Sequence, residues 1–372
     1  MRIGVPREIK NQEYRVGMVP GIVRELTKRG HEVWVEHCAG AGIGIDDEDY
    51  IAAGAFIASE PQALFSAAEF IVKVKEPQQE EWMRLGPEHT LFAYLHLAPD
   101  PDQTAALLAS GATCIAYETV SDAQGGLPLL APMSEVAGRL AIQAGARGLE
   151  KNSGGSGILL GGIPGVEPAK VLIVGAGTVG FNACQMAVGI GARVVVIDRS
   201  AAALRRLDAH FQSRICTVYS SADAIDRHLP DSDLVIGAVL VPGAATPKLV
   251  SRAELKLLKP GSVLVDVAID QGGCFESSKP TTHDVPSFVY EGVVHYCVTN
   301  MPGVVPRTST FALNNATLPF VIAMAEKGVI SALREDPYLI DGLNIYRGKL
   351  TERPVAEAQG RDYTSALDAI GR

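Results

Sequence analysis

Several features that mark large classes of protein are missing from this sequence. No two of its six cysteines have CxxC spacing, aromatic residues make up only 6% of the 372 residues, and no basic tract interrupts a chain with a formal net charge of −9. No apolar run approaches the roughly 18 residues of a membrane span. We therefore expect a protein that binds neither nucleic acid nor a membrane.

Motifs of several enzyme classes are also absent. The sequence contains no GxSxG elbow, no P-loop and no HExxH helix. Glu118 is an isolated acidic residue with no evident His or Cys partner, so we expect no required metal ion. The six cysteines lie far apart and several, such as Cys114 and Cys297, lie in apolar segments, which predicts that the cysteines are buried free thiols in a reducing compartment. A charged turn at Arg7 and Glu8 follows only a short apolar stretch, so we expect no signal peptide and a cytoplasmic location.

What is present is an alternation of short apolar runs with helix-like patterns. The length and the 47% apolar content allow two buried cores. In the first third, the predicted strands are Arg2–Pro6, His31–His37, Phe70–Val74, Thr90–Leu97 and Cys114–Thr119, and the predicted helices are Pro20–Arg29 and Asp102–Ser110. This order is typical of parallel βαβ units.

The middle third repeats the pattern more clearly. A helix is predicted over Met133–Glu150, and a glycine-rich segment over 153–157 follows it. Runs that suit strands buried on both faces of a parallel sheet cover Val171–Val174, Val194–Ile197, Leu234–Ala238 and Val263–Ala268. We expect a last long helix, Thr308–Lys327, to lead back to the first domain.

The strongest local motif begins at the end of the strand Val171–Val174. The sequence Gly175-Ala176-Gly177-Thr178-Val179-Gly180 is GxGxxG, and a helix, a second strand and Asp198 follow it. Gly175 permits a tight turn, Gly177 lets the backbone approach a pyrophosphate, and Gly180 lets helix and strand pack closely. The motif predicts dinucleotide binding at a helix N-terminus. Asp198 favours NAD, because a 2′-phosphate would meet a carboxylate, although Arg199 leaves NADP open.

The fold expected from these patterns is α/β, with two doubly wound domains. The second is a Rossmann dinucleotide-binding domain over residues 129–306, inserted into a discontinuous substrate domain formed by residues 1–128 and 307–372. A second glycine cluster, Gly40–Gly44, is followed by four acidic residues that would repel a pyrophosphate. We interpret that cluster as an ordinary turn.

Polar residues at strand ends are the candidates for chemistry, because ligands of open α/β sheets lie beyond the carboxyl ends of the strands. The candidates are Lys73 and Lys75, Tyr94 and His96, Asp270, and the cations Arg7, Lys10 and Arg15 of a polar loop. A lysine at a strand end either binds a carboxylate or is simply solvated. A histidine there either acts as an acid–base group or is a buried residue whose hydrogen bonds are all made. An arginine pairs bidentately with a small carboxylate, but composition alone does not choose among the three loop cations. Asp266, deeper in its strand, is expected to be structural.

Several blocks together resemble the alanine dehydrogenase family. They include Arg2–Glu8 with Tyr14-Arg15-Val16, Val72–Pro77, Tyr94–Leu97, Ala116–Thr119, Ala131–Gly138, the glycine motif, Gly237–Gly243, Asp266–Gly273 and Thr299–Gly303. The resemblance extends to about residue 330. It implies reversible NAD-dependent deamination of L-alanine to pyruvate and ammonia, and a homohexamer.

The resemblance also implies roles for individual residues. Arg15 and Lys75 match positions that bind the substrate carboxylate and carbonyl, while His96 and Asp270 match the two groups that handle water and proton transfers. The positions that match cofactor contacts are Ser134, Gly175, Gly177, Thr178, Val179, Gly180, Asp198, Ser220, Val239, Leu240, Val267, Ala268, Ile269, Asp270, Lys279, Val298, Asn300 and Met301. Lys279 stands where relatives can carry arginine, which keeps the charge but loses the planar fork.

Three other functions are compatible with a dinucleotide motif. A nucleotide-binding subunit of proton-translocating transhydrogenase would lack amino-acid chemistry, a 2-hydroxy- or 2-oxo-acid reductase would not need ammonia, and an NAD sensor would bind without turnover. The retained Arg15, Lys75, His96 and Asp270 favour the amino-acid dehydrogenase.

Overall fold

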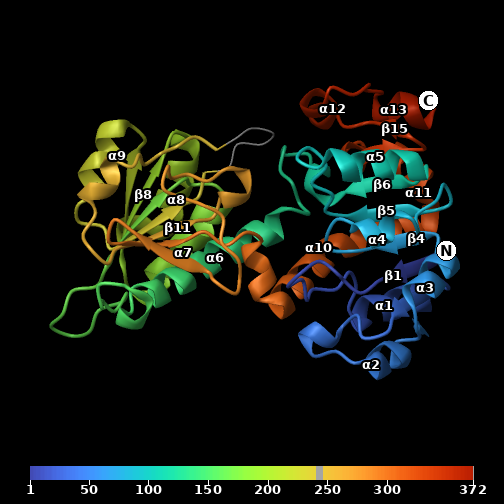
Figure 1. Ribbon diagram of the computed structural model, residues 1–372, viewed down its shortest axis with the longest axis horizontal. Helices are drawn as coiled ribbons and strands as arrows, with labels where there is room; N and C mark the ends of the chain where they lie inside the picture. The colour runs from blue at the N-terminus through green and yellow to red at the C-terminus, as the bar shows by residue number, and fades with distance from the viewer. Residues whose placement is uncertain (240–245, 372) are drawn as a thin grey trace. The chain divides into compact units, whose positions relative to one another are not determined.

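The computed structural model describes residues 1–239 and 246–371, which form two α/β units (Figure 1). Unit 1 consists of Met1–Met133 and Val305–Arg372, and unit 2 of Ser134–Val304. The domain boundaries predicted from the sequence lie between residues 128 and 129 and between residues 306 and 307. Each unit is a mainly parallel sheet with helices on its faces, so the predicted fold class, with one unit inserted into a discontinuous other, is confirmed.

Unit 1 contains an eight-stranded sheet. Its strands are β1 (Arg2–Val5), β2 (Glu32–Glu36), β3 (Phe56–Ala58), β4 (Phe70–Val72), β5 (Thr90–Ala93), β6 (Thr113–Ala116), β14 (Leu343–Tyr346) and β15 (Lys349–Leu350). Their order is β3-β2-β1-β4-β5-β6-β14-β15, and the first six are parallel. The sequence analysis did not predict the antiparallel strands β14 and β15.

Helices cover both faces of this sheet. They are α1 (Pro20–Lys28), α2 (Asp47–Ala52), α3 (Pro61–Ala67), α4 (Gln79–Trp82), α5 (Pro101–Ser110), α10 (Pro306–Lys327), α11 (Val329–Glu335), α12 (Arg353–Gln359) and α13 (Ala366–Ile370). The side chains of the sheet alternate between two cores, so Val72 and Phe92 lie in one and Ile71 and Leu91 in the other.

The long helix α10 fixes the segment that follows Arg15. Its Asn314 side chain accepts a hydrogen bond from the Val19 amide at 2.7 Å and donates to the Val16 and Gly17 carbonyls. Within the described part of the chain, no single helix is long and apolar enough to cross a membrane. Only α10 and α11 taken together reach that length and hydropathy, and they are bent by 116° at their junction.

Unit 2 contains a seven-stranded sheet and its helices. Its elements are α6 (Ala131–Gly148, starting three residues before the unit), β7 (Lys170–Val174), α7 (Thr178–Ile190), β8 (Arg193–Asp198), α8 (Ala201–Phe211), β9 (Ile215–Tyr219), α9 (Ala222–His228), β10 (Leu234–Gly237), β11 (Val263–Asp266), β12 (Ser287–Tyr290) and β13 (Val293–Tyr296). The order β9-β8-β7-β10-β11-β13 is that of a Rossmann sheet, with antiparallel β12 at one edge.

Two predictions about local structure are wrong in detail. The strand predicted over Thr90–Leu97 ends at Ala93, because the amides of Leu95 and His96 donate to the Glu118 carboxylate instead of extending the strand. The cysteines are not uniformly buried, since Cys38 is partly exposed and Cys216, on the edge strand β9, is exposed. The cluster Gly40–Gly44 forms a short 3₁₀ turn, as expected.

Candidate active site

The charged candidates of unit 1 gather where the strand order reverses. The central strand β1 has β2 on one side and β4 on the other, so the segments that leave β1 and β4 diverge at their carboxyl ends. Glu8 and Arg15 follow β1, Lys73 and Lys75 follow β4, and His96 follows β5. Ligands of open α/β sheets bind at such switch points.

Glu8 joins the two segments. Its carboxylate accepts a hydrogen bond from the Val74 amide at 2.7 Å and a longer one from the Lys75 amide at 3.4 Å. The Lys73 ammonium lies 3.2 Å from Glu8 and 2.8 Å from the carboxylate of Glu81 on α4. Both lysines are buried, which excludes the interpretation of two solvated lysines.

This buried network holds one ammonium between two carboxylates. Burial raises the pKa of Glu8, and the negative charges of Glu81 and Glu13 raise it further. Together they outweigh the lowering effect of the Lys73 charge, and the pKa is about 7. The carboxylates of Glu8 and Glu81 outweigh burial at Lys73 and raise its pKa, so the ammonium stays charged. Lys73 is therefore occupied by structural partners, which leaves Lys75 as the lysine at the site.

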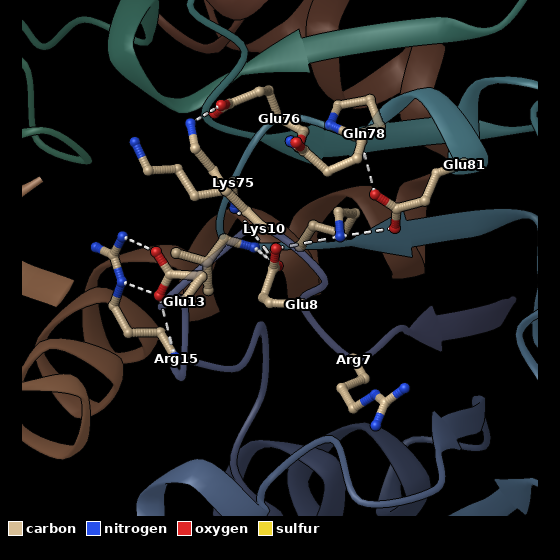
Figure 2. A network of polar contacts seen from close by, with 12 residues as sticks. Arg7, Glu8, Lys10, Glu13, Arg15, Lys75, Glu76, Gln78 and Glu81 are labelled. Carbon is tan, nitrogen blue, oxygen red and sulfur yellow. Dashed lines mark hydrogen bonds and ion pairs between the residues drawn. The ribbon is translucent and has the colours of Figure 1, made fainter. Parts of the chain in front are cut away.

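Arg15 is held by a neighbour two residues away. Its Nε and Nη2 atoms lie 2.7 and 2.6 Å from the two carboxylate oxygens of Glu13, a bidentate ion pair (Figure 2). Nη1 lies 3.1 Å from the sulfur of Met133. Burial opposes the charge, but Glu13 outweighs it and raises the pKa of Arg15. Glu13 thus fixes the plane of the guanidinium.

The other two cations of the loop have separate partners. Arg7 is exposed and pairs with Glu36 at the end of β2, and Lys10 pairs with Glu76. Of the three candidates for a carboxylate clamp, Arg15 is the buried one.

Lys75 and His96 lie next to each other. The Lys75 ammonium is 3.4 Å from His96 Nε2. His96 has a left-handed backbone (φ 48°) and donates its amide to Glu118 at 2.7 Å. Its ring stacks on that of Tyr94, with centroids 6.0 Å apart, and the Tyr94 hydroxyl donates to the Leu129 carbonyl at 2.6 Å. The anchored Tyr94 ring therefore orients the exposed imidazole of His96 beside the Lys75 ammonium.

The glycine motif of unit 2 has the geometry that its spacing predicts. Gly175 has φ 111°, and a Cβ there would lie 2.5 Å from the Ala238 carbonyl oxygen beyond the neighbouring strand β10. A Cβ on Gly180 would lie 1.8 Å from the Gly175 carbonyl oxygen, whereas one on Gly177 would meet nothing within 4 Å. The open backbone at Gly177 and the N-terminus of α7 fit a dinucleotide pyrophosphate.

Asp198 lies at the end of β8, beside this turn. Its two carboxylate oxygens each accept a backbone hydrogen bond at 2.6 Å, one from Ala176 and one from Ser200. Each carboxylate oxygen has a second lone pair, so these bonds orient the group and leave it able to accept from a ribose. The Ser220 amide donates to the Asp198 carbonyl at 3.0 Å, which keeps β9 in register beside it.

Asp270 and Asn300 lie together at another edge of unit 2. The backbone N–H of Asn300 donates to the Asp270 carboxylate at 3.4 Å, and Asn300 has φ 56°. Asp270 is exposed in a short 3₁₀ helix after β11. Asp266, in contrast, is fully buried and accepts from the Cys274 amide at 2.8 Å and the Ser278 hydroxyl at 2.6 Å, as its structural interpretation requires.

The remaining predicted cofactor residues are dispersed over unit 2. Ser134 lies in the first turns of α6, and Thr178 and Val179 open α7. Val267 and Val298 follow β11 and β13, as do Ala268, Ile269 and Met301, which are buried. Val239 follows β10, and Leu240 lies outside the described residues. Lys279 is exposed, with its ammonium 4.4 Å from the Phe288 ring centroid.

Sequence reasoning missed the carboxylates that hold the site. Glu8, Glu13, Glu81 and Glu118 each bind a cation or a backbone amide next to a predicted residue. A signal was present for Glu13 alone, because an acidic residue two positions before a buried arginine is its nearest available partner. The other three approach from segments that are distant in the sequence.

Comparisons with known proteins agree with the fold. The family model for the alanine dehydrogenase/PNT N-terminal domain matches residues 4–137, and that for the C-terminal domain matches residues 141–353. The chain is 59% identical over 371 residues to the alanine dehydrogenase of Halomonas elongata and 52% identical over 370 residues to that of Mycobacterium tuberculosis, with 100% of each chain covered.

Solved structures are similar over the same length. A structure of L-alanine dehydrogenase superposes with a TM-score of 0.93 at 48% identity, covering 96% of this chain and 99% of that one. A transhydrogenase from Sinorhizobium meliloti gives a TM-score of 0.81 at 24% identity, which shows a shared fold. On the strength of both family models and full-length relatives, the chain belongs to the alanine dehydrogenase/PNT family.

Proposed function

We propose that this protein is an amino-acid dehydrogenase that converts L-alanine, NAD⁺ and water reversibly into pyruvate, ammonium and NADH. The observation that carries the proposal is the group formed by Arg15, Lys75 and His96 at the switch point of unit 1. Two cations and an adjacent imidazole suit a small 2-amino or 2-oxo acid. The full-length alanine dehydrogenases among its relatives support this choice of substrate.

In this proposal, Arg15 and Lys75 bind the substrate. Arg15 pairs with the carboxylate that alanine and pyruvate share, and its fixed plane lowers the entropy lost on binding. Lys75 is buried and lies 3.4 Å from His96, so it polarises the pyruvate carbonyl beside the imidazole. Glu8 positions Lys75 through the amides of Val74 and Lys75.

Unit 1 is proposed as the substrate domain and unit 2 as the NAD domain. The glycine turn, Asp198 and the predicted residues that follow β10, β11 and β13 would hold NAD. When bound, the nicotinamide supplies the acceptor for the hydride of the alanine Cα. The carboxylate of Asp198 selects against the 2′-phosphate of NADP by charge repulsion.

His96 and Asp270 are proposed to move the protons of the hydrolytic steps. Oxidation leaves an iminium, which water must attack, so one group accepts a proton from that water. Collapse of the resulting carbinolamine releases ammonia, and a proton must be delivered to its nitrogen. Imidazole suits both transfers at neutral pH. The backbone N–H of Asn300, also in unit 2, holds the Asp270 carboxylate in place.

We further propose a cytoplasmic homohexamer that requires no metal ion. These proposals rest on the family resemblance and on the composition. A sedimentation mass of one subunit would overturn the hexamer, and loss of activity with a chelator would overturn the absence of a metal.

The test is NADH oxidation by pyruvate, followed by absorbance, with and without ammonium. Turnover only when ammonium is present supports the proposal. Turnover with pyruvate alone would indicate a hydroxy-acid dehydrogenase, and NADH binding without turnover would indicate a transhydrogenase-like subunit or a sensor. The His96→Ala and Asp270→Ala variants, each compared with the unchanged protein, would then show whether both groups are needed.

A further inference from the structure

A second group of reactive side chains lies in unit 1, on the loop that follows β2. The thiol of Cys38 is 3.2 Å from His37 Nε2, and His37 Nδ1 is 2.5 Å from a carboxylate oxygen of Asp47, the first residue of α2. The other Asp47 oxygen accepts the Cys38 amide at 2.9 Å. Asp47 therefore holds both the imidazole and the backbone that carries the thiol.

This arrangement has the parts of an activated nucleophile. A thiol contacts one ring nitrogen of a histidine, and a carboxylate orients the ring through the other nitrogen. The three side chains form a group of possible metal ligands, the one such group among the residues that the structure describes. One ligand atom from each of the three lies within 4.8 Å of the others, but the thiol and the carboxylate contact different ring nitrogens, and a metal would bind only one of the two. The geometry favours proton transfer from the thiol over metal binding.

In the part of the chain that the structure describes, each of the other cysteines lacks either solvent access or an oriented base. Cys114, Cys184, Cys274 and Cys297 are buried, and burial raises the pKa of each to about 12. Cys216 is exposed on β9, and among residues 1–239 and 246–371 no side chain forms a hydrogen bond with its thiol. Cys38 combines solvent access with an oriented base, and Cys216 has access alone. The chain thus supplies its own control.

We propose that Cys38 is a modification site that undergoes thiol–disulfide exchange with small disulfides, with His37 as its base and Asp47 as the residue that positions His37. The Cys38 thiol gives its proton to His37 Nε2, and its sulfur forms a bond to one sulfur of the disulfide. The S–S bond of the reagent breaks, and the departing thiolate takes the proton. Cys38 is oxidised to a mixed disulfide and the reagent is reduced to one thiol.

The size of the effect follows from the thiolate fraction. An ordinary thiol is only a few per cent thiolate at pH 7, so complete deprotonation raises the rate by at most about 30-fold. A base within hydrogen-bond distance of the thiol supplies part of this gain. We expect Cys38 to react about tenfold faster than Cys216.

The experiment uses the full chain and dithiodipyridine, an aromatic disulfide whose released thione absorbs light. Cys216→Ser leaves Cys38 as the accessible thiol, and Cys38→Ser leaves Cys216. The proposal expects the first variant to react about tenfold faster at neutral pH. It also expects oxidised glutathione to add to the peptide that contains Cys38, as seen by mass spectrometry. Equal rates, or a faster Cys216, would overturn the proposal.

Two further variants test the base. In the Cys216→Ser background, His37→Ala should slow Cys38 about tenfold, and Asp47→Asn should slow it by a smaller factor. In the Cys38→Ser background, His37→Ala must leave the rate of Cys216 unchanged, which shows that the fold is intact. A Cys38 that stays fast without His37 would refute the role of the imidazole. The outcome does not depend on alanine dehydrogenase activity, so it is separable from the proposed function.

Discussion

Three glycines of one turn and helix permit a sharp test of the dinucleotide site. Gly180→Ala places a Cβ 1.8 Å from the Gly175 carbonyl oxygen, and because real contacts of this kind do not come closer than 3.0 Å, the backbone must move by at least about 1.2 Å. Gly177→Ala places a Cβ in open space at a backbone φ of −70°, which alanine adopts readily. Gly189→Ala, near the end of α7, also meets nothing within 4 Å.

The three variants should separate folding from binding. Overpacking costs roughly 1–3 kcal/mol, so Gly180→Ala should lower the Tm by about 2–12 °C. Gly189→Ala should raise stability by about 0.5–1 kcal/mol, because alanine is the better helix former. Gly177→Ala should keep the wild-type Tm but weaken NADH binding at least about tenfold, or about 1.4 kcal/mol, because its methyl group fills the space that a pyrophosphate needs.

The assays are thermal unfolding by circular dichroism and NADH titration by fluorescence. If Gly177→Ala binds NADH as tightly as Gly189→Ala does, the backbone of this turn is not where the pyrophosphate lies. If Gly180→Ala keeps the wild-type Tm, the close approach of helix and strand is not what requires glycine there.

Three further predictions concern unit 1. Glu13→Gln should lower the free energy of unfolding by about 3–5 kcal/mol, since it removes the carboxylate charge that forms the buried bidentate pair with Arg15; denaturant titration measures this, and a loss below about 1 kcal/mol would contradict it. Lys75→Met should raise the KM for pyruvate at least about tenfold while NADH affinity stays at the wild-type value, which steady-state kinetics and fluorescence titration check. Burial raises the pKa of Glu8 from 4.5 to about 7, so this group favours the folded state below pH 4.5 and that contribution is lost as the pH rises through 7. The stability of Glu8→Gln relative to wild type should therefore increase between these pH values by up to about 3 kcal/mol, and Tm values that stay parallel across the range would disprove it.

The sequence predicted most of the parallel framework because its signals are local. Runs such as Val194–Ile197 are strands through their own β-branched residues, and the turn from Gly175 to Gly180 needs glycine for reasons that lie within six residues. The strands β14 and β15 were missed because they are short and carry polar residues, and they are strands only through their pairing with β6 and each other. β14 depends on its pairing with β6, which is distant in the sequence, and β15 depends on its pairing with β14.

The candidate site was predicted less completely for the same reason. The sequence marked Lys73 and Lys75 as candidates at a strand end, but it did not show that Lys73 is paired with Glu8, which is 65 residues away in the sequence. His96 has a left-handed backbone and donates its backbone amide to Glu118, and neither feature leaves a trace in local composition. The identity of a residue makes it a candidate for the site. Its partners in the fold decide whether it has a structural role or can contact a ligand.

In the proposed function, one strand order serves two kinds of ligand. In each sheet the first strand lies inside the sheet, with the next two strands on one side and the following strands on the other. In unit 2 the first strand leads into glycines, which expose backbone N–H groups and a helix N-terminus suited to a diffuse pyrophosphate charge. In unit 1 it leads into Glu8, Glu13 and Arg15, so the same position carries buried ion pairs instead. In the proposed function, Arg15 is the single cation that pairs with the substrate carboxylate, and Glu13 fixes its plane. On this proposal, the shared topology sets where each ligand binds, and the residues that follow the first strand select the ligand.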